Sequence, residues 1–248
     1  MKIPFLGGSY TSQSRRADAE RTMNLYPERI ESPLAKTALA LYFTPGFSKR
    51  CTLTTGPIRG LFEVNNRVFV VGWGEFCEMS LIDPLGAVSN DNIAVTVRGT
   101  IPSSSALATM HSNGDAGHQV FITSVGHGYI FDLVSAAFTE VDCTVNPTYG
   151  EFMDGYFLAL DTTTSTLAIS DLEDGLTWSA ADHAQRNTAA DKWVRMLVAH
   201  KEVWLFGNRT ADVYYNSGNA LFPFEPIPGA LLDQGIAAVD SAAAFDNT

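Results

Sequence analysis

The sequence predicts an all-β fold, a β-propeller of four-stranded antiparallel blades that is incomplete in this chain, with an irregular N-terminal arm. One observation is local. Residues 194–199, 203–206 and 211–215 are short runs rich in β-branched and aromatic residues, separated by polar turns, which is the signal of β-strands. Strands joined by such short connections must run up, down and up, so they form one antiparallel sheet.

The second observation is that this unit recurs along the chain. Each turn lies between a small or apolar strand and an aromatic-rich strand. The turns at Asp154, His200 and Asp246 are about 46 residues apart, and Asn65 lies about 89 residues, roughly two periods, before Asp154. The turns are Asn65-Asn66, the loop 112–117, Asp154-Gly155, His200-Lys201 and Asp246-Asn247. A repeat of about 40–50 residues that forms a small sheet is typical of a propeller. An evenly spaced β-sandwich is the alternative; the propeller is favoured because the aromatic strand falls on the same side of each turn.

The repeat divides the chain into two parts. Residues 1–55 are expected to form the arm and the region of the first strand, and residues 56–248 the blades, about four and a partial fifth. The arm contains clustered arginines, which are Arg15, Arg16, Arg21 and Arg29. It either packs on its own domain as a strap or reaches a neighbouring subunit, and the sequence leaves both readings open.

The blades are expected at residues 58–80 with an outer part in 81–102, and then at 107–141, 149–170 and 193–218. Residues 180–185 are expected to form a short helix, since Ser179 and Asp182 resemble a capping box. Residues 221–228 are expected to be a proline-held extended loop.

Asp233 is expected to open the fifth unit, which stops at Asp246 in the turn where its second strand should begin. A hairpin with one strand missing leaves an unpaired edge. We therefore expect the chain to be a fragment of a longer polypeptide, or another chain to complete the sheet.

Composition excludes several functions. The formal charge of −11 and the pI near 4.8 argue against a surface that binds nucleic acid through phosphates, or one that binds an anionic membrane. Cys51, Cys77 and Cys143 are dispersed without a CxxC pair, so free thiols in a reducing cytosol are expected. The first residues have no apolar segment of the signal-peptide type, and no apolar run approaches the length of about 20 residues that a membrane helix needs.

The sequence predicts no catalytic, cofactor-binding or metal-binding residue. Its histidines, His111, His118, His127, His183 and His200, include no closely spaced ligand pair. There is no P-loop, no G-x-S-x-G and no G-x-G-x-x-G.

One alternative is a sialidase-like propeller glycosidase or a glycan-binding module. Residues 171–178 approximate the Asp-box, a structural turn of sialidase-like propellers. Such an enzyme needs three converging arginines and a Tyr/Glu nucleophile pair, and Arg59, Arg98 and Arg195 are the candidates. Some aromatic residues could line a glycan groove, although core packing is their commoner use. These are Trp73, Trp178, Trp193, Trp204, Phe69 and Phe121.

Several short motifs occur in a recognisable order. They are Asn-Leu-Tyr-Pro at 24–27, Thr-Pro-Gly-Phe-Ser-Lys-Arg at 44–50, Arg-Gly at 59–60, Ser-Asp-Leu-Glu-Asp at 170–174, Val-Trp-Leu-Phe-Gly at 203–207, Thr-Ala-Asp-Val-Tyr-Tyr at 210–215 and Asp-Gln-Gly-Ile-Ala at 233–237. This ordered set, spanning residues 20–240, resembles the packaged-DNA stabilisation proteins, the tail hub or nozzle proteins of short-tailed phages of the Salmonella-phage type. Known members of that family are longer, which agrees with the incomplete fifth unit.

The resemblance implies a structural virion protein of the phage tail and not an enzyme, with no cofactor. It implies a propeller-bearing subunit in a hexameric ring below the portal and its adaptor ring, assembled in the host bacterial cytoplasm. The ring would close or extend the DNA exit channel, stabilise packaged DNA until its ejection, and offer attachment to tailspike and tail needle proteins. DNA would pass without sequence-specific binding, since an acidic lining repels it.

Overall fold

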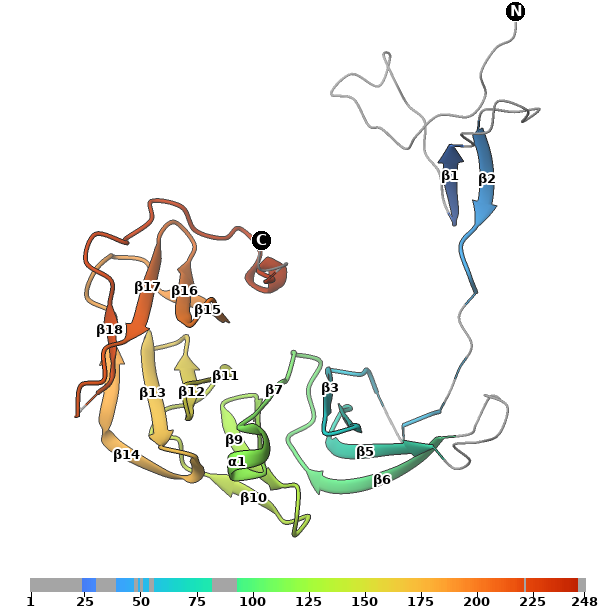
Figure 1. The fold of residues 1–248 in the computed structure, drawn as a ribbon, viewed down its shortest axis with the longest axis horizontal. Helices are drawn as coiled ribbons and strands as arrows, with labels where there is room; N and C mark the ends of the chain where they lie inside the picture. Colours follow the sequence, from blue (N-terminus) through green and yellow to red (C-terminus); the bar gives the residue numbers. More distant parts are fainter. Residues whose placement is uncertain are drawn as a thin grey trace, which may run out of the picture. The chain divides into compact units, whose positions relative to one another are not determined.

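The computed structural model describes residues 24–29, 39–46, 49, 51–53, 56–81, 93–220 and 222–244 (Figure 1). The chain divides into two compact units, Met1–Lys49 and Arg50–Thr248. Each unit is described by itself.

The first unit contains a two-stranded antiparallel ribbon, formed by β1 (Leu25–Arg29) and β2 (Leu39–Phe43). Tyr26 lies opposite Tyr42, and their rings stack with centroids 5.8 Å apart. The segment expected as an irregular arm therefore contains two short strands that pair with each other. The arginines at positions 15, 16 and 21 lie outside the described residues.

Among its described residues, the second unit contains four four-stranded antiparallel sheets, numbered in chain order (Figure 1). Sheet 1 consists of β3 (Gly60–Val64), β4 (Arg67–Val71), β5 (Glu75–Leu81) and β6 (Ile93–Thr100). Sheet 2 consists of β7 (Thr109–Ser112), β8 (Gln119–Ser124), β9 (His127–Asp132) and β10 (Phe138–Val141). A single helical turn, α1 (Gly114–Gly117), joins β7 to β8.

Sheets 3 and 4 repeat this plan. Sheet 3 consists of β11 (Tyr149–Met153), β12 (Tyr156–Asp161), β13 (Thr166–Asp171) and β14 (Asp174–Gln185). Sheet 4 consists of β15 (Trp193–Ala199), β16 (Glu202–Gly207), β17 (Ala211–Asn216) and β18 (Phe224–Pro226), and a short 3-10 helix, η1 (Val239–Ser241), follows it. In every sheet the strands are neighbours in chain order, which confirms the predicted meander.

Three of the predicted turns have the same backbone geometry. Both central residues have positive φ in each of them: 52° and 58° at Asn65-Asn66, 50° and 88° at Asp154-Gly155, and 54° and 60° at His200-Lys201. Two such residues make the tight hairpin turn whose twist matches antiparallel strands. The recurring turn therefore joins the first two strands of sheets 1, 3 and 4, while the helical turn α1 replaces it in sheet 2.

Neighbouring sheets meet along their first strands, because β3 contacts β7, β7 contacts β11 and β11 contacts β15. Glycines allow this close approach. A Cβ at Gly60 would lie 2.8 Å from the carbonyl oxygen of Ala108, and a Cβ at Gly150 would lie 2.8 Å from the Phe121 ring. First strands that line up on one side are what a β-propeller requires. The all-β propeller fold is thus confirmed.

The core is built from the faces that consecutive sheets turn toward each other. One cluster joins sheets 1 and 2 through Phe69, Phe76 and Phe131, whose rings are 5.2–5.5 Å apart. Another joins sheets 3 and 4 and includes the fully buried Trp193 and Leu160. Each sheet between two others therefore buries both faces, which explains why its strands are almost continuously apolar.

Two local predictions are wrong. Residues 180–185 belong to strand β14 and not to a helix, because their backbone pairs with β13 at Ala168↔His183 and Leu167↔Ala184. The expected loop at 221–228 supplies the fourth strand of sheet 4, since Phe224 lies opposite Asn216.

The fifth unit has no counterpart in the described residues. After β18, Leu232 makes an isolated bridge to Ala211, and the only helix or strand element in the described residues 227–244 is η1. The turn predicted at Asp246-Asn247 lies outside the part that the structure describes.

Candidate functional site

Three successive first strands each supply one charged or titratable side chain. These are His111 on β7, Glu151 on β11 and Arg195 on β15. Nδ1 of His111 lies 3.2 Å from Oε2 of Glu151, so this pair links sheet 2 to sheet 3. Arg195 acts on both groups through its positive charge. We call these three residues the inner-strand row.

Burial controls the ionisation of the inner-strand row. Glu151 is only 7% exposed, and burial raises its pKa to about 8, although the charge of Arg195 and the backbone N–H of Val198 favour the ionised form. Burial, followed by the charge of Arg195, lowers the pKa of His111 to about 4. Both shifts favour the neutral form of the group, as low-dielectric surroundings do. At pH 7 the row therefore combines a neutral imidazole, a mostly protonated carboxyl and one cation.

The cation of the row is held by groups on either side. The guanidinium carbon of Arg195 lies 4.4 Å from the centroid of the Tyr149 ring, within the range of a cation–π contact. Its NH1 is 3.8 Å from Oδ1 of Asp240, which also accepts a hydrogen bond of 3.1 Å from the Tyr149 hydroxyl. Asp240 belongs to η1, so the segment after sheet 4 returns to the inner strands.

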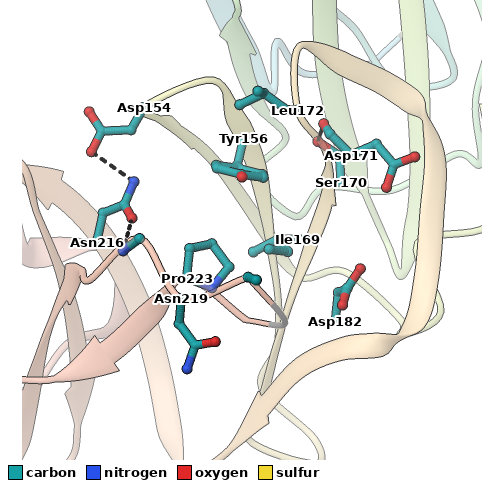
Figure 2. Close-up of a pocket in the computed structure, with 12 residues that line it drawn as sticks. Asp154, Tyr156, Ile169, Ser170, Asp171, Leu172, Asp182, Asn216, Asn219 and Pro223 are labelled. Atoms are coloured by element: carbon teal, nitrogen blue, oxygen red, sulfur yellow. Dashed lines mark hydrogen bonds between the residues drawn. The ribbon is translucent and has the colours of Figure 1, made fainter.

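A pocket of about 450 Å³ lies between sheets 3 and 4 (Figure 2). Its lining combines carboxylates with apolar side chains: Asp154, Asp171, Asp182, Ile169, Leu172 and Pro223. Asn216 Nδ2 donates a 3.2 Å hydrogen bond to Asp154 Oδ2 on one side of the pocket, and Asp171 and Asp182 lie on the other. This lining of carboxylates and apolar side chains suits the binding of a basic or apolar side chain better than it suits catalysis on a substrate.

The three arginines that a sialidase-like site needs are engaged separately. Arg59 is 1% exposed and donates to the carbonyl oxygens of Ala106 and Pro102 and to the hydroxyl of Ser124. Arg98 pairs with Glu78 at 2.8 Å. Arg195 has the partners described above. These three arginines have no partner in common.

The segment that approximates the Asp-box comprises the last residue of β13, the turn at Leu172-Glu173 and the first five residues of β14. Asp174 accepts hydrogen bonds from the Leu176 N–H and the Thr177 hydroxyl, at 2.9 Å each, and Trp178 Nε1 donates to the Gly175 carbonyl at 2.8 Å. These contacts are internal to the turn. The segment therefore shapes the backbone, as such a turn does in the proteins that it resembles.

Most of the aromatic residues that could line a glycan groove are packed inside. Trp193, Phe69 and Phe121 have no exposed surface, and Trp178 is half-buried with its ring 5.4 Å from that of Phe121. Trp73 is 38% exposed. The interpretation as core residues is supported for the buried ones.

Cys51, Cys77 and Cys143 are free thiols, as predicted. Burial raises the pKa of Cys77 to about 11 and raises that of Cys143 still further, so both are held as inert thiols. No group of three or more His, Cys, Asp or Glu side chains in the described part of the chain could hold a metal ion. In that same part, no helix has the length and apolar character of a membrane span.

Sequence reasoning missed the inner-strand row as a unit. In the sequence, His111 stands out only as a possible metal ligand and Arg195 only as a possible sialidase arginine, and no motif includes Glu151. The available signal was a charged residue in the middle of an otherwise apolar first strand, as in Tyr-Gly-Glu-Phe-Met at β11.

The family model described as "Bacteriophage P22 Gp10, beta-propeller" (Phage_stabilise) matches residues 1–248. The chain belongs to this family. It is therefore a phage DNA-stabilising β-propeller protein, and the resemblance seen in the sequence is confirmed. Membership agrees with a structural component of the virion. None of the curated proteins matches the chain.

The chain is similar to several solved structures at low sequence identity. The computationally designed Ika8 protein matches with a TM-score of 0.51 and 10% identity over 92% of this chain and 64% of its own. The WD40 domain of Pan2 from Neurospora crassa matches with a TM-score of 0.47 and 13% identity, over 69% of this chain and 52% of its own. AztD from Citrobacter koseri matches with a TM-score of 0.46 and 10% identity, over 86% of this chain and 57% of its own. This member of the P22 Gp10 family thus spans about half to two thirds of the length of these structures.

Proposed function

We propose that this protein is a tail hub, or nozzle, subunit of a short-tailed phage. Six copies form a ring below the portal and its adaptor ring, close or extend the DNA exit channel, and keep packaged DNA inside until ejection. The ring also offers attachment to tailspike and tail needle proteins, and it assembles in the host cytoplasm. The observation that carries this proposal is the match of one phage DNA-stabilising family to the entire chain.

The distribution of charge supports a channel through which DNA slides. Residues 99–185, which include sheets 2 and 3, contain eleven Asp and Glu residues and no Lys or Arg. Five of these carboxylates are exposed: Asp115, Glu140, Asp142, Asp154 and Asp171. Since DNA affinity comes largely from cations on phosphates, such a surface repels DNA and leaves it free to move.

The packing supports a scaffold rather than a catalyst. Neighbouring sheets are joined by continuous aromatic cores, and buried side chains such as Arg59 tie one sheet to the next. The glycosidase alternative requires arginines that converge, and Arg59, Arg98 and Arg195 each bind different partners. No observation favours a second function.

A DNA-retention assay tests the proposal. Phage heads filled with DNA but lacking this subunit are incubated with the purified protein, and the DNA that becomes sensitive to nuclease is measured over time. The proposal predicts that DNA stays protected in proportion to the protein added. Albumin of the same concentration and net charge is the control. Equal DNA loss with and without the protein contradicts the proposal.

A further inference from the structure

The β1–β2 ribbon has apolar side chains on both of its faces. By the pairing register, Tyr26 and Tyr42 share one face, while Leu25 and Phe43 share the other. Tyr26 is 46% exposed, Tyr42 is 45% exposed and Phe43 is 83% exposed. A ribbon of two strands has no core of its own and is marginally stable in water. It therefore needs a surface to cover it.

The unit that contains the ribbon has the opposite charge to the rest of the chain. Residues 1–49 have seven Lys or Arg against four Asp or Glu, a formal charge of +3, whereas residues 50–248 have nine against 23, a charge of −14. Opposite potentials on two surfaces favour their encounter and suppress wrong pairings. The chemistry that suits the ribbon is accordingly an acidic surface with an apolar floor.

The pocket between sheets 3 and 4 has that chemistry (Figure 2). Its rim includes the exposed Asp154 and Asp171, and its lining includes Ile169, Pro223 and Leu172, of which Leu172 is 61% exposed. A volume of about 450 Å³ is large enough for one aromatic side chain. No Lys or Arg occurs among its lining residues, so its carboxylates have no cation within the pocket.

The chain connects the ribbon to sheet 1, and sheet 1 is a less suitable docking surface than the acidic pocket. Cys51 already lies against that sheet, with its sulfur 3.6 Å from that of Met79, and the seven residues between Phe43 and Cys51 extend over at most about 25 Å. Glu78 of sheet 1 already binds both Arg67 and Arg98. The acidic pocket lies two sheets further along the chain.

We propose that the β1–β2 ribbon of one copy docks on the pocket between sheets 3 and 4 of a second copy, with Phe43 as the apolar anchor. This inference rests on the proposed ring, because only a repeating assembly supplies the second copy. The contact joins two different surfaces of the same chain. A head-to-tail contact of that kind repeats from copy to copy and closes into a ring when the rotation allows.

Two variants of the full chain test the docking by complementation. In the first, Tyr26→Ser with Phe43→Ser removes the apolar side chains of the ribbon and leaves the pocket intact. In the second, Asp154→Lys with Asp171→Lys reverses the charge of the pocket rim and leaves the ribbon intact. Sedimentation velocity measures self-association of each variant, and tryptophan fluorescence during urea unfolding checks that sheets 1–4 are folded.

The wild type is expected to self-associate, and each variant alone to do so at least tenfold more weakly. A mixture of the two variants is expected to form a one-to-one complex, because one supplies the ribbon and the other the pocket, and 0.5 M NaCl is expected to weaken it. Val134→Ser is the matched control, because Val134 is an apolar residue between β9 and β10 of sheet 2 that is 76% exposed and lies outside the pocket. This variant should associate as the wild type does. Leu172→Ser is unsuitable as a control because Leu172 lines the pocket.

Three outcomes overturn the inference. Variants that associate as the wild type does show that the ribbon and the pocket are not the interface. Variants that stay monomeric when mixed show that the ribbon of one copy does not bind the pocket of another. If the wild type and both variants all form six-fold rings on portals, the docking is refuted and the proposed function still stands. If the wild type forms no ring on portals, the proposed function itself is refuted.

Discussion

Sheet 4 and the junction of sheets 2 and 3 are held by different kinds of polar contact. At sheet 4, the buried Arg186 pairs with Asp212 of β17 at 2.9 Å and with Asp191 at 3.2 Å. Trp193 of β15 donates from Nε1 to Oδ2 of Asp212 at 2.7 Å. The anchor of sheet 4 is thus a network of buried charges.

The junction of sheets 2 and 3 relies mainly on neutral amides. The Gln119 side-chain oxygen on β8 accepts a 2.7 Å hydrogen bond from the Gly175 N–H of β14, while the Gln119 backbone N–H donates to Asn113 Oδ1 at 2.8 Å. Asn113 Nδ2 donates to the carbonyl of Glu173 at 3.3 Å. No cation is part of these contacts.

The two junctions should respond differently to a single substitution. Removal of one member of a buried ion pair leaves an uncompensated charge in a low-dielectric interior, which costs more than a lost amide hydrogen bond. Removal of both charges together is much cheaper, because no charge is left without a partner. Sheet 4 is therefore the junction that is more sensitive to a single substitution.

The largest effect is expected at Asp212. Asp212→Ala leaves the buried Arg186 without the nearer of its two carboxylate partners and takes away the acceptor of Trp193, so the free energy of unfolding should fall by about 3–5 kcal/mol. Urea unfolding followed by tryptophan fluorescence measures this. The double variant Arg186→Met, Asp212→Asn should recover most of the loss, because the remaining carboxylate, Asp191, still accepts hydrogen bonds from the backbone N–H groups of Arg209 and Thr210. A single variant that loses less than about 1 kcal/mol would falsify the role of the charged anchor.

A smaller loss is expected at the amide junction. Gln119→Ala leaves the buried N–H of Gly175 without its acceptor, which should lower the free energy of unfolding by about 1–3 kcal/mol. The same urea experiment compares it with Asp212→Ala. The exposed Thr139→Ala on β10 is the control and should change stability little. If Gln119→Ala costs as much as Asp212→Ala, the contrast between the two junctions disappears.

Glu151 tests the inner-strand row through pH. Its pKa rises from an ordinary 4.5 to about 8 in the folded protein, so the folded state holds a proton that the unfolded state releases. This contribution to stability is complete below about pH 4.5 and is lost as the pH rises toward about 8. Glu151→Gln should remove that loss, so its stability relative to the wild type should grow between pH 5 and pH 8 in denaturant melts. A constant difference across this range contradicts the assignment.

The smallest effect is expected where sheets 3 and 4 use the same turn with different residues. Sheet 3 has Gly155 at the second central position, with φ of 88°, and sheet 4 has Lys201 there, with φ of 60°. A side chain at positive φ costs about 1 kcal/mol relative to glycine. Lys201→Gly should therefore stabilise the protein by up to about 1 kcal/mol in a thermal melt, whereas Gly155→Lys should destabilise it. If neither variant changes the melting temperature, the two turns are not equivalent.

The predictions from sequence succeeded where the signal was local. Asp154-Gly155 and His200-Lys201 mark hairpins because their own chemistry tolerates positive φ. The prediction of a helix at 180–185 was wrong because these residues pair with β13. The residues around Ser179 resemble a capping pattern but carry no information about that distant strand. The pair of His111 and Glu151 could not be found, since it joins two sheets whose packing is not encoded at either residue alone.

The central claim is that this propeller protein forms a ring under the phage portal. Negative-stain electron microscopy of the purified full-length protein, mixed with isolated portal-adaptor complexes, tests it most directly. We expect six-fold rings that cap one end of the portal complex along its axis. Portals that stay bare, with the protein dispersed as single particles at every concentration, would contradict it.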